Sequence, residues 1–235
     1  LNKPVILTGS QLPIGMIRTD GKENLITAIE IAAAKEKGKP IVSEVCIYFE
    51  YQLYRGNRTH KFNAEHFQAF QSANYPVLAE AGVHLKYTHS ALQKGTGKKL
   101  KVHSSLDSNI AILKMFPGIT QNVVEAILNT KNVKAIIIET IGSGNASTQK
   151  WFIDALKKSI DKGVIILNVT QCNAGKVQQG KYATSAAFKK IGVIGSSDIT
   201  TEAAVAKLMF VLGTTANKKE IEKLLKKDLR GEMTV

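Results

Sequence analysis

The apolar positions at the start of the chain follow a strand, a helix and a second strand. Residues 4–9 (PVILTG) form a continuous apolar run that ends in a glycine, as is typical of a strand buried in a parallel sheet. Residues 20–38 repeat apolar side chains at helical spacing, on a stripe of Leu25, Ala28, Ile29 and Ala32. Residues 41–50 form another short apolar run. This order predicts a β–α–β unit whose two parallel strands are joined by a right-handed crossover.

Local signals at its two ends limit this helix to residues 20–38. Asp20 stands where a carboxylate can accept hydrogen bonds from the free N–H groups of the first turn, and Glu23 can reach back to complete a capping box. Gly38 is expected to end the helix, with two lysines near the negative end of the helix dipole. We therefore expect a capped helix with one apolar stripe against the sheet.

Strands and helices alternate about every 25–30 residues in the second half of the chain, which is typical of a doubly wound α/β domain. The predicted strands are residues 109–118, 133–142 and 164–172. The predicted helices are residues 120–130, beginning at Thr120, then 147–163, then 200–213, beginning at Thr200 or Thr201, and 217–229. The predicted fold class is therefore α/β, with two doubly wound domains.

Two breaks in this pattern divide the chain into domains. Residues 62–85 show no clear periodicity, and residues 92–101 are polar, with two glycines and four lysines. We expect a first domain at 1–91, a linker at 92–107 and a second domain at 108–235. The first domain has only two clear strands and one long helix, so both edges of its sheet would lie bare. The first domain is therefore expected to be incomplete.

The loops that follow predicted strands are the places to search for chemistry, because ligands bind beyond the carboxyl ends of parallel strands. These loops are residues 8–11 (TGSQ), 54–61 (YRGNRTHK), 139–145 (ETIGSGN) and 168–172 (NVTQC). A glycine-rich turn at a helix N-terminus, such as 142–145, can bind a carboxylate. It can equally be a plain strand-to-helix turn that Asn145 caps.

Four side chains of loop 54–61 can be positively charged: Arg55, Arg58, His60 and Lys61. A lysine in a partly desolvated cleft has a lowered pKa and can act as the base for a hydroxyl nucleophile, and Lys61 is the candidate for this role. The residues by themselves leave a second interpretation open, in which Arg55, Arg58 and Lys61 are solvated loop charges.

Several kinds of site are absent from the sequence. Residues 142–147 nearly match the dinucleotide fingerprint, but Ser147 replaces the third glycine and the next strand ends without an acid to hold a ribose. There is no Walker, H-E-x-x-H, C-x-x-C or G-x-S-x-G motif, and the five histidines lack metal-ligand spacing. We predict neither a metal nor a cofactor.

The composition is that of a globular protein, with 44% hydrophobic and 22% charged residues. The net charge is +13, but the lysines are dispersed over helix faces and one loop, and aromatics make up only 6%, so we predict no nucleic-acid partner. No apolar run reaches the roughly 18 residues that cross a bilayer, so we predict no membrane association. Cys46 and Cys172 lie in strand-like runs, and we expect buried free thiols of a cytoplasmic protein.

A series of motifs links the chain to a known family. They are KPVILTGSQLPIGMIRTDGKENLITAIEIA, LYRGNRTHK, MFPGIT, GSGNAS, NVTQCNAGKV, YATSAAF, GVIGSSDITTEAAVAKL and LRGEMT. Through them the chain resembles the bacterial type I (cytosolic) L-asparaginases over essentially all of its 235 residues. The resemblance implies a larger N-terminal and a smaller C-terminal α/β domain in a homodimer or homotetramer. It also implies a threonine nucleophile that hydrolyses L-asparagine to L-aspartate and ammonia.

The same resemblance suggests roles for individual residues. Lys61 matches the lysine of the family's Thr–Lys–Asp triad, and residues 9–11 follow the strand that borders the catalytic pocket. Asn145 matches an asparagine that a neighbouring subunit presents to the substrate, and residues 140–144 shape its loop. Asn145, Gly144 and Ser143 are therefore the candidate substrate-binding residues.

A regulatory site is also implied, in altered form. In the allosterically regulated bacterial type I enzyme, the segment that matches Thr170 and Cys172 holds an effector asparagine. Glu139 stands where that enzyme has an arginine, and an acid there removes a partner of the effector's carboxylate. We therefore expect activation by asparagine to be weak or absent.

The family's T-G-G-T and H-G-T-D-T motifs do not occur in the sequence. The chain therefore resembles roughly the last two-thirds of a type I asparaginase, and the nucleophile would come from an N-terminal segment of the same protein. We expect the chain to be inactive by itself. Two alternatives are a non-catalytic relic that binds amino acids or dimerises, and a subunit of an RNA-linked amidotransferase of the same superfamily.

Overall fold

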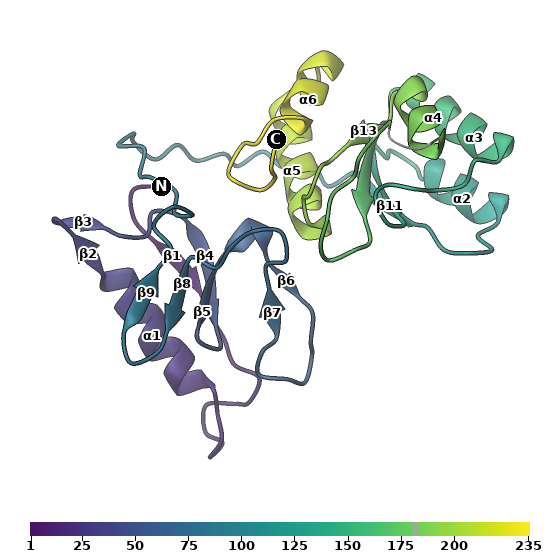
Figure 1. The fold of residues 1–235 in the computed structure, drawn as a ribbon. Helices are drawn as coiled ribbons and strands as arrows, with labels where there is room; N and C mark the ends of the chain where they lie inside the picture. Colours follow the sequence, from purple (N-terminus) through teal and green to yellow (C-terminus); the bar gives the residue numbers. More distant parts are fainter. Residues whose placement is uncertain (181–182) are drawn as a thin grey trace. The chain divides into compact units, whose positions relative to one another are not determined.

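The computed structural model describes residues 1–180 and 183–235, which form two compact units (Figure 1). The first unit is Leu1–Val102 and the second is His103–Val235, and the break falls in an irregular segment without strands or helices. The finer division into 1–91, 92–107 and 108–235 remains a prediction. Residue 182, with which the motif YATSAAF begins, lies outside the described residues.

The first unit is built on a five-stranded sheet in the order β1-β4-β5-β8-β9. β1 (Val5–Leu7) and β4 (Val45–Phe49) pair in parallel on either side of α1 (Gly21–Ala33) in the sequence, which confirms the predicted strand–helix–strand order and parallel pairing. Three antiparallel strands extend the sheet: β5 (Gln52–Arg55), β8 (Ala79–Ala81) and β9 (Leu85–Tyr87). These strands are three or four residues long, too short to give a periodic signal.

Two small hairpins complete this unit, β2 (Lys35–Glu36) with β3 (Lys39–Pro40), and β6 (His60–Lys61) with β7 (Phe70–Gln71). A 3₁₀ turn, Gly56–Arg58, precedes β6. The predicted end of the first helix at Gly38 is wrong, because the helix ends at Ala33. Lys37 and Gly38, with φ of 50° and 77°, instead form the turn between β2 and β3. A two-residue turn of this kind needs positive φ at both positions, which explains the glycine.

The capping box predicted for α1 is also wrong. Asp20 occupies the N-cap position but its side chain makes no capping hydrogen bond. Its carboxylate accepts hydrogen bonds from the backbone N–H groups of Gln11 and Leu12 instead. Glu23 accepts from the Tyr48 hydroxyl at 2.6 Å rather than reaching back to the helix start. Both acids therefore fix other elements against α1 instead of capping it.

The buried stripe of α1 differs from the predicted stripe. Of the predicted residues only Ala28 is buried, whereas Leu25 and Ile29 are 46% and 60% exposed. The helix buries Gly21, Asn24, Ala28 and Ile31. Ala28 and Ile31 join a core with Tyr48, Leu53 and Leu78 from the sheet and its connections. The other apolar side chains of α1, such as Leu25 and Ile29, do not belong to this core.

The second unit is a four-stranded parallel sheet whose strands lie in chain order. The strands are β10 (Ile110–Lys114), β11 (Ala135–Thr140), β12 (Ile165–Thr170) and β13 (Ile194–Gly195). The helices are α2 (Gln121–Leu128), α3 (Lys150–Asp161), α4 (Ala183–Ile191), α5 (Thr201–Thr214) and α6 (Lys218–Leu225). All elements predicted here exist, while the sequence pattern missed α4 and β13.

Helices cover both faces of this sheet (Figure 1). Ile136, Ile138 and Ile166 face a cluster with side chains of α2, α3 and α4. The alternate residues Ile137 and Leu167 face a second cluster with α5 and α6. Because both faces are covered, the strands read as continuous apolar runs, which is why the sequence predicted them well.

Helix starts in this unit follow the predicted positions. The Thr200 side chain accepts a hydrogen bond from the Ala203 N–H, so it caps α5 as expected. Thr120 is the N-cap residue of α2, but its hydroxyl makes no capping hydrogen bond.

No helix within residues 1–180 and 183–235 is long and apolar enough to cross a membrane.

A buried ion pair holds the last residues of the chain against α5. The Lys207 amino group lies 2.8 Å from a Glu232 carboxylate oxygen, and both side chains are almost fully buried. Glu232 also accepts hydrogen bonds from the backbone N–H groups of Leu229 and Arg230. Burial opposes ionisation of this carboxyl, but the hydrogen bonds from Lys207 and the two backbone groups prevail and hold its pKa well below the usual range.

Candidate functional site

The basic segment 54–61 separates into buried arginines and an exposed lysine. The Arg55 guanidinium donates to Glu44 at 2.6 Å and to the Ala91 carbonyl at 2.8 Å. The guanidinium carbons of Arg55 and Arg58 lie 4.2 and 5.1 Å from the centre of the Tyr75 ring. The interpretation of these two residues as solvated charges is therefore wrong, because both are internal and structural.

Lys61 is exposed at the end of β6, so within this chain its side chain is solvated and does not lie in the partly desolvated cleft that was predicted. Its amino group lies 3.2 Å from the side-chain oxygen of Gln11 and 5.8 Å from the centre of the Phe70 ring. The Gln11 amide nitrogen donates to the His66 carbonyl at 2.9 Å. Gln11 thereby links Lys61 to the loop after β1. This contact forms even though β6 does not directly follow β4, because the antiparallel strand β5 lies between them in the chain.

The loop after β1 is held in place by the start of α1. Asp20 accepts from the Gln11 and Leu12 backbone N–H groups at 2.9 and 3.1 Å. The Asn24 amide donates to the Gly9 carbonyl at 2.9 Å and to Asp20 at 3.2 Å. Sequence reasoning missed both Asp20 and Asn24 as parts of this site. Asn24 could have been found from the sequence, because it is a polar side chain on the face that α1 buries, and a buried polar side chain needs a hydrogen-bond partner.

The tip of the β4–β5 hairpin joins the same network. Glu50 and Tyr51 both have positive φ, 46° and 65°, although neither is a glycine. The Glu50 N–H donates to the Asn24 side-chain oxygen at 3.1 Å. Burial, together with the nearby charges of Asp20 and Glu23, raises the pKa of the Glu50 carboxyl. Asn24 therefore connects a strained turn, the loop after β1 and the start of α1.

In the second unit, residues 141–145 form a closed turn between β11 and the segment that leads to α3. The backbone N–H and carbonyl groups of Ile141 and Asn145 exchange two hydrogen bonds of 2.9 Å. Gly142 and Gly144 have positive φ, 58° and 107°. Asn145 and Ser143 are half-buried, and Gly144 is buried. The structure thus places the three predicted residues of this loop in one compact turn.

The candidate effector residues lie at the ends of β11 and β12. A Glu139 carboxylate oxygen accepts from the Thr201 hydroxyl at 2.6 Å, and the Lys114 amino group lies 3.8 Å from the other oxygen. The Thr170 hydroxyl donates to the Gly142 carbonyl at 2.6 Å and accepts from the Cys172 N–H at 3.0 Å. Glu139 therefore already has protein partners in this chain.

The two cysteines differ from each other. Both are free, and Cys46 is buried in β4, where desolvation raises the pKa of its thiol. Cys172 is exposed, so the prediction that it is a buried thiol is wrong. It follows the end of β12 in the chain, where the pattern of buried residues stops.

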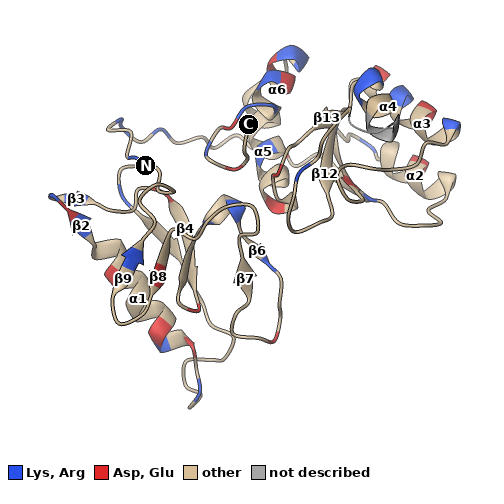
Figure 2. Ribbon diagram, viewed as in Figure 1, with Lys and Arg blue, Asp and Glu red and all other residues tan. Residues whose placement is uncertain are grey.

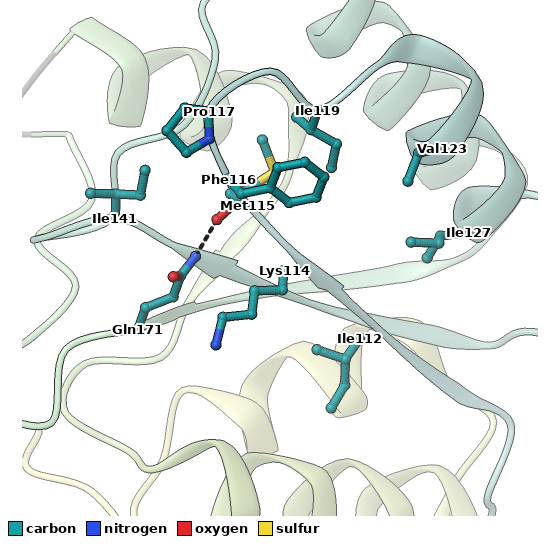
Figure 3. A pocket seen from close by; sticks show the side chains of 10 residues that line it. All are labelled: Ile112, Lys114, Met115, Phe116, Pro117, Ile119, Val123, Ile127, Ile141 and Gln171. Carbon is teal, nitrogen blue, oxygen red and sulfur yellow. Dashed lines mark hydrogen bonds between the residues drawn. The ribbon is translucent and has the colours of Figure 1, made fainter.

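An apolar pocket of about 520 Å³ opens beside the carboxyl ends of β10, β11 and β12 (Figure 3). Phe116, Ile141 and Val123 are among its lining residues and are about half exposed. The side-chain nitrogen of Gln171 donates to the backbone carbonyls of Met115 and Glu139 at 2.6 and 2.8 Å, which ties the end of β12 to the ends of β10 and β11.

The described residues include no group of three metal-ligating side chains.

Comparison with known proteins identifies the family. Residues 1–93 match the family model "Asparaginase, N-terminal", and residues 109–225 match "Glutaminase/Asparaginase C-terminal domain". L-asparaginase 1 of Escherichia coli K12 is 41% identical over 234 residues, which are 100% of this chain and 68% of the relative. This chain belongs to the type I L-asparaginase family. The family places it among the amidohydrolases.

Solved structures of asparaginases agree with the fold. L-asparaginase I of Vibrio cholerae has a TM-score of 0.91 at 39% identity, and the match covers 100% of this chain and 69% of that structure. The thermostable L-asparaginase of Thermococcus kodakarensis has a TM-score of 0.89 at 30% identity, with the same coverage. The asparaginase α/β fold with its N- and C-terminal domains is thus confirmed, and the chain spans about two-thirds of such structures.

A more distant relative bears on the alternatives. A glutamyl-tRNA(Gln) amidotransferase component of Pyrococcus abyssi is 28% identical over 237 residues, and the match covers 53% of that protein. The roles predicted for Lys61, Ser143, Gly144, Asn145, Glu139, Thr170 and Cys172 remain predictions.

Proposed function

We propose that this chain is the C-terminal part of a cytoplasmic enzyme that hydrolyses L-asparagine to L-aspartate and ammonia. The observation that carries the proposal is the placement of Lys61 beside Gln11, in the loop that follows the carboxyl end of parallel strand β1. Together with the 41% identity to an L-asparaginase, this placement supports Lys61 as the lysine of the Thr–Lys–Asp triad.

In this mechanism the nucleophile is a threonine of an N-terminal segment. Its hydroxyl oxygen attacks the carbon of the side-chain amide while the amino nitrogen of Lys61 accepts the hydroxyl proton. The C–N bond of the tetrahedral intermediate then breaks, and the amide nitrogen leaves as ammonia after it receives a proton. Water cleaves the resulting ester to release L-aspartate and regenerate the threonine. The reaction uses neither a metal nor another cofactor.

Three threonines of the first unit are poor substitutes for that nucleophile. The hydroxyl of Thr8 donates to the Tyr48 carbonyl at 2.9 Å, and that of Thr59 donates to the Arg55 carbonyl at 2.6 Å. The Thr19 hydroxyl donates to the Leu12 carbonyl at 3.0 Å. Each of these hydroxyls serves a local turn or strand. These bonds support the proposal that the chain is inactive by itself.

Exposed apolar side chains support an N-terminal segment of the same protein as a partner. β1 is the edge strand of its sheet, and its Val5 and Leu7 are 42% and 56% exposed. Leu25, Ile26 and Ile29 of α1 are also exposed. A bare edge strand and an apolar helix surface are features that folded proteins normally cover. We propose that the remaining third of the family's length supplies this cover along with the nucleophile.

The substrate assignment is tested on the protein that includes the N-terminal segment. We expect it to release ammonia from L-asparagine and to form L-aspartate in equal amounts. A folded protein that binds asparagine without releasing ammonia would instead support the non-catalytic, amino-acid-binding alternative. Glutamine as the second substrate measures the selectivity between the two side-chain amides.

A subunit of an RNA-linked amidotransferase is the second candidate, because of the similarity to the amidotransferase component of Pyrococcus abyssi. The charge distribution argues against it, since basic and acidic residues are interspersed along the ribbon (Figure 2). On α3, Lys150 pairs with Asp154 and Lys157 pairs with Asp161. Specific binding of tRNA at physiological salt would favour this candidate over the asparaginase.

We further propose that the protein is a homodimer or homotetramer. In such an assembly Asn145, with Ser143 and Gly144, would contribute to the substrate site of a neighbouring subunit, as the family resemblance implies. Light scattering of the purified protein at several concentrations tests this, and a stable, active monomer would contradict it.

A further inference from the structure

The turn 141–145 is anchored through every carbonyl oxygen of its three central residues. Gly142 O accepts from the Thr170 hydroxyl at 2.6 Å, Ser143 O accepts from the Gln178 N–H at 3.0 Å, and Gly144 O accepts from the Asn168 amide at 3.4 Å. The two hydrogen bonds between Ile141 and Asn145 close the turn at its base. A surface turn normally leaves such carbonyls to water, so this one is fixed by the protein itself.

Two of the three anchors are side chains of β12. Asn168 and Thr170 are two residues apart, so they project from the same face of the strand. Asn168 is fully buried in a strand whose other residues are Ile, Leu, Val and Thr. Burial of an amide in such a place is costly unless the amide is hydrogen-bonded. Asn168 therefore needs a hydrogen-bond partner inside the protein, and the Gly144 carbonyl of the turn is one such partner.

The orientation of the Asn168 amide is determined by a second contact. The Thr140 hydroxyl donates to the Asn168 side-chain oxygen at 2.6 Å, so the amide nitrogen faces the Gly144 carbonyl. The backbone carbonyl of Asn168 accepts from both the N–H and the hydroxyl of Ser196. Thr140 and Ser196 are also buried. The anchor is thus a closed polar network inside the second unit rather than a single weak contact.

The turn lies directly on these anchors. Gly144 has a φ of 107°, and a Cβ atom at this position would lie 2.9 Å from a methyl carbon of Val177 and 3.2 Å from the Asn168 amide nitrogen. The glycine is therefore required both by its backbone conformation and by the close approach.

We propose that Asn168 and Thr170 are positioning residues, which hold turn 141–145 in one conformation so that Ser143 and Asn145 are presented to the substrate without a further ordering step. The inference rests on the proposed function, because it concerns the same substrate site. A preformed turn lowers the entropic cost of substrate binding. Loosening it weakens binding while the triad chemistry stays intact, so KM changes more than kcat.

The first test is amide hydrogen exchange in the 235-residue chain, with Thr170→Val as the main variant. This substitution removes one hydroxyl and keeps the side-chain shape. The Asn145 and Ile141 amides should exchange roughly five- to ten-fold faster, the size expected for loss of the hydrogen bond to the Gly142 carbonyl. The bond that the hydroxyl accepts from the Cys172 N–H, outside the turn, is lost with it. Thr170→Ser, which restores the hydroxyl, should return exchange close to the wild-type rate. Asn168→Leu should accelerate the same two amides.

The matched control is Thr214→Val at the end of α5. Thr214 also donates its hydroxyl to a single backbone carbonyl, that of Phe210, at 2.7 Å. This variant loses a similar bond elsewhere in the same unit and should leave exchange in turn 141–145 unchanged. Unchanged exchange in Thr170→Val as well would overturn the anchoring, whatever the protein's activity.

The second test is kinetic and uses the protein with its N-terminal segment. Thr170→Val should raise KM for asparagine several-fold with kcat changed by less than about two-fold, and Thr170→Ser should restore KM. Faster exchange with an unchanged KM would overturn the positioning role. If the wild-type protein released no ammonia, the proposed function would fail, and exchange would still decide whether Asn168 and Thr170 anchor the turn.

Discussion

Lys61 is the residue whose role can be tested most simply. In the protein with its N-terminal segment, Lys61→Met should lower kcat about 10²- to 10⁴-fold, because loss of a general base has effects of that size. The circular dichroism spectrum and melting temperature should stay unchanged, since Lys61 is exposed and its side chain bonds to Gln11, which is only partly buried.

Lys86→Met is the matched control for this substitution. Lys86 is an exposed strand lysine in the same unit, in β9. Its replacement should leave kcat within a factor of about two of wild type, the range expected for a surface change away from the chemistry. Near-full activity of Lys61→Met would remove Lys61 from the triad.

Glu139 leads to a prediction about regulation. Its carboxylate would repel the carboxylate of an effector asparagine and is already bonded to the Thr201 hydroxyl. A charged hydrogen-bond partner contributes about 1.5–3 kcal/mol, so its loss should weaken effector binding by tens- to hundreds-fold. The velocity curve in asparagine should therefore be hyperbolic. A strongly sigmoidal curve that Cys172→Ala abolishes would show that an effector site is present.

Single residues were predictable from the sequence only where their surroundings were local. Lys61, Ser143 and Asn145 were suggested by motifs of the family, and their roles remain predictions. Arg55 was misjudged because its partner, Glu44, becomes its neighbour only when β4 and β5 pair. Asn168 lay in one of the loops singled out from the sequence, but its anchoring contacts to Thr140 and Gly144 depend on how the strands are aligned.

Elements were predictable in proportion to their length and burial. β11 and β12, six residues each and covered on both faces, gave strong apolar runs. β5, β8 and β9 are short strands of an antiparallel extension and gave none. For α1 the presence of a helix was predicted correctly, but its end and its buried face were not. The buried face was misjudged because Leu25 and Ile29 are as apolar as the residues that the core buries.

The two faces of α1 allow a stability test. In the isolated chain, Ile29→Ala should change the free energy of unfolding by less than about 0.5 kcal/mol, because Ile29 is largely exposed. Ile31→Ala on the buried face should cost about 2–5 kcal/mol. Urea unfolding measures both. A large cost for Ile29→Ala in the isolated chain would mean that this face is already covered.

The Lys207–Glu232 pair gives the docking of the last residues on α5 a dependence on pH. The pKa of Glu232 is lowered in the folded state, so its contribution to stability is complete above the pKa of the unfolded chain, about 4.3 for a glutamate. The contribution is lost as the pH falls towards the folded-state pKa. Glu232→Gln should cost about 3–5 kcal/mol at pH 7, because it leaves Lys207 buried without its anion.

The check is urea unfolding of the wild type and Glu232→Gln at several pH values. The difference in unfolding free energy should shrink below about pH 4, because Glu232 of the unfolded wild-type chain then takes up a proton while the folded-state carboxyl stays charged. A difference that is the same at pH 3 and pH 7 would show that the ion pair does not determine the effect.

At the scale of the whole molecule, the fold class followed from the alternation of elements and from the family motifs. The parallel sheet of the second unit was correctly predicted from the sequence. The mixed sheet of the first unit was not, because its antiparallel strands depend on pairings that no local pattern encodes. The prediction that the first domain is incomplete agrees with the 69% coverage of a solved asparaginase structure.

The central claim is that this chain supplies the lysine and the scaffold, and that the N-terminal segment supplies the nucleophile. The most direct measurement is ammonia release from L-asparagine by the purified 235-residue chain, before and after addition of that segment as a separate polypeptide. The account predicts no release above background from the chain by itself and clear release after the addition, absent when the chain carries Lys61→Met. Steady turnover by the chain without the segment would contradict the account.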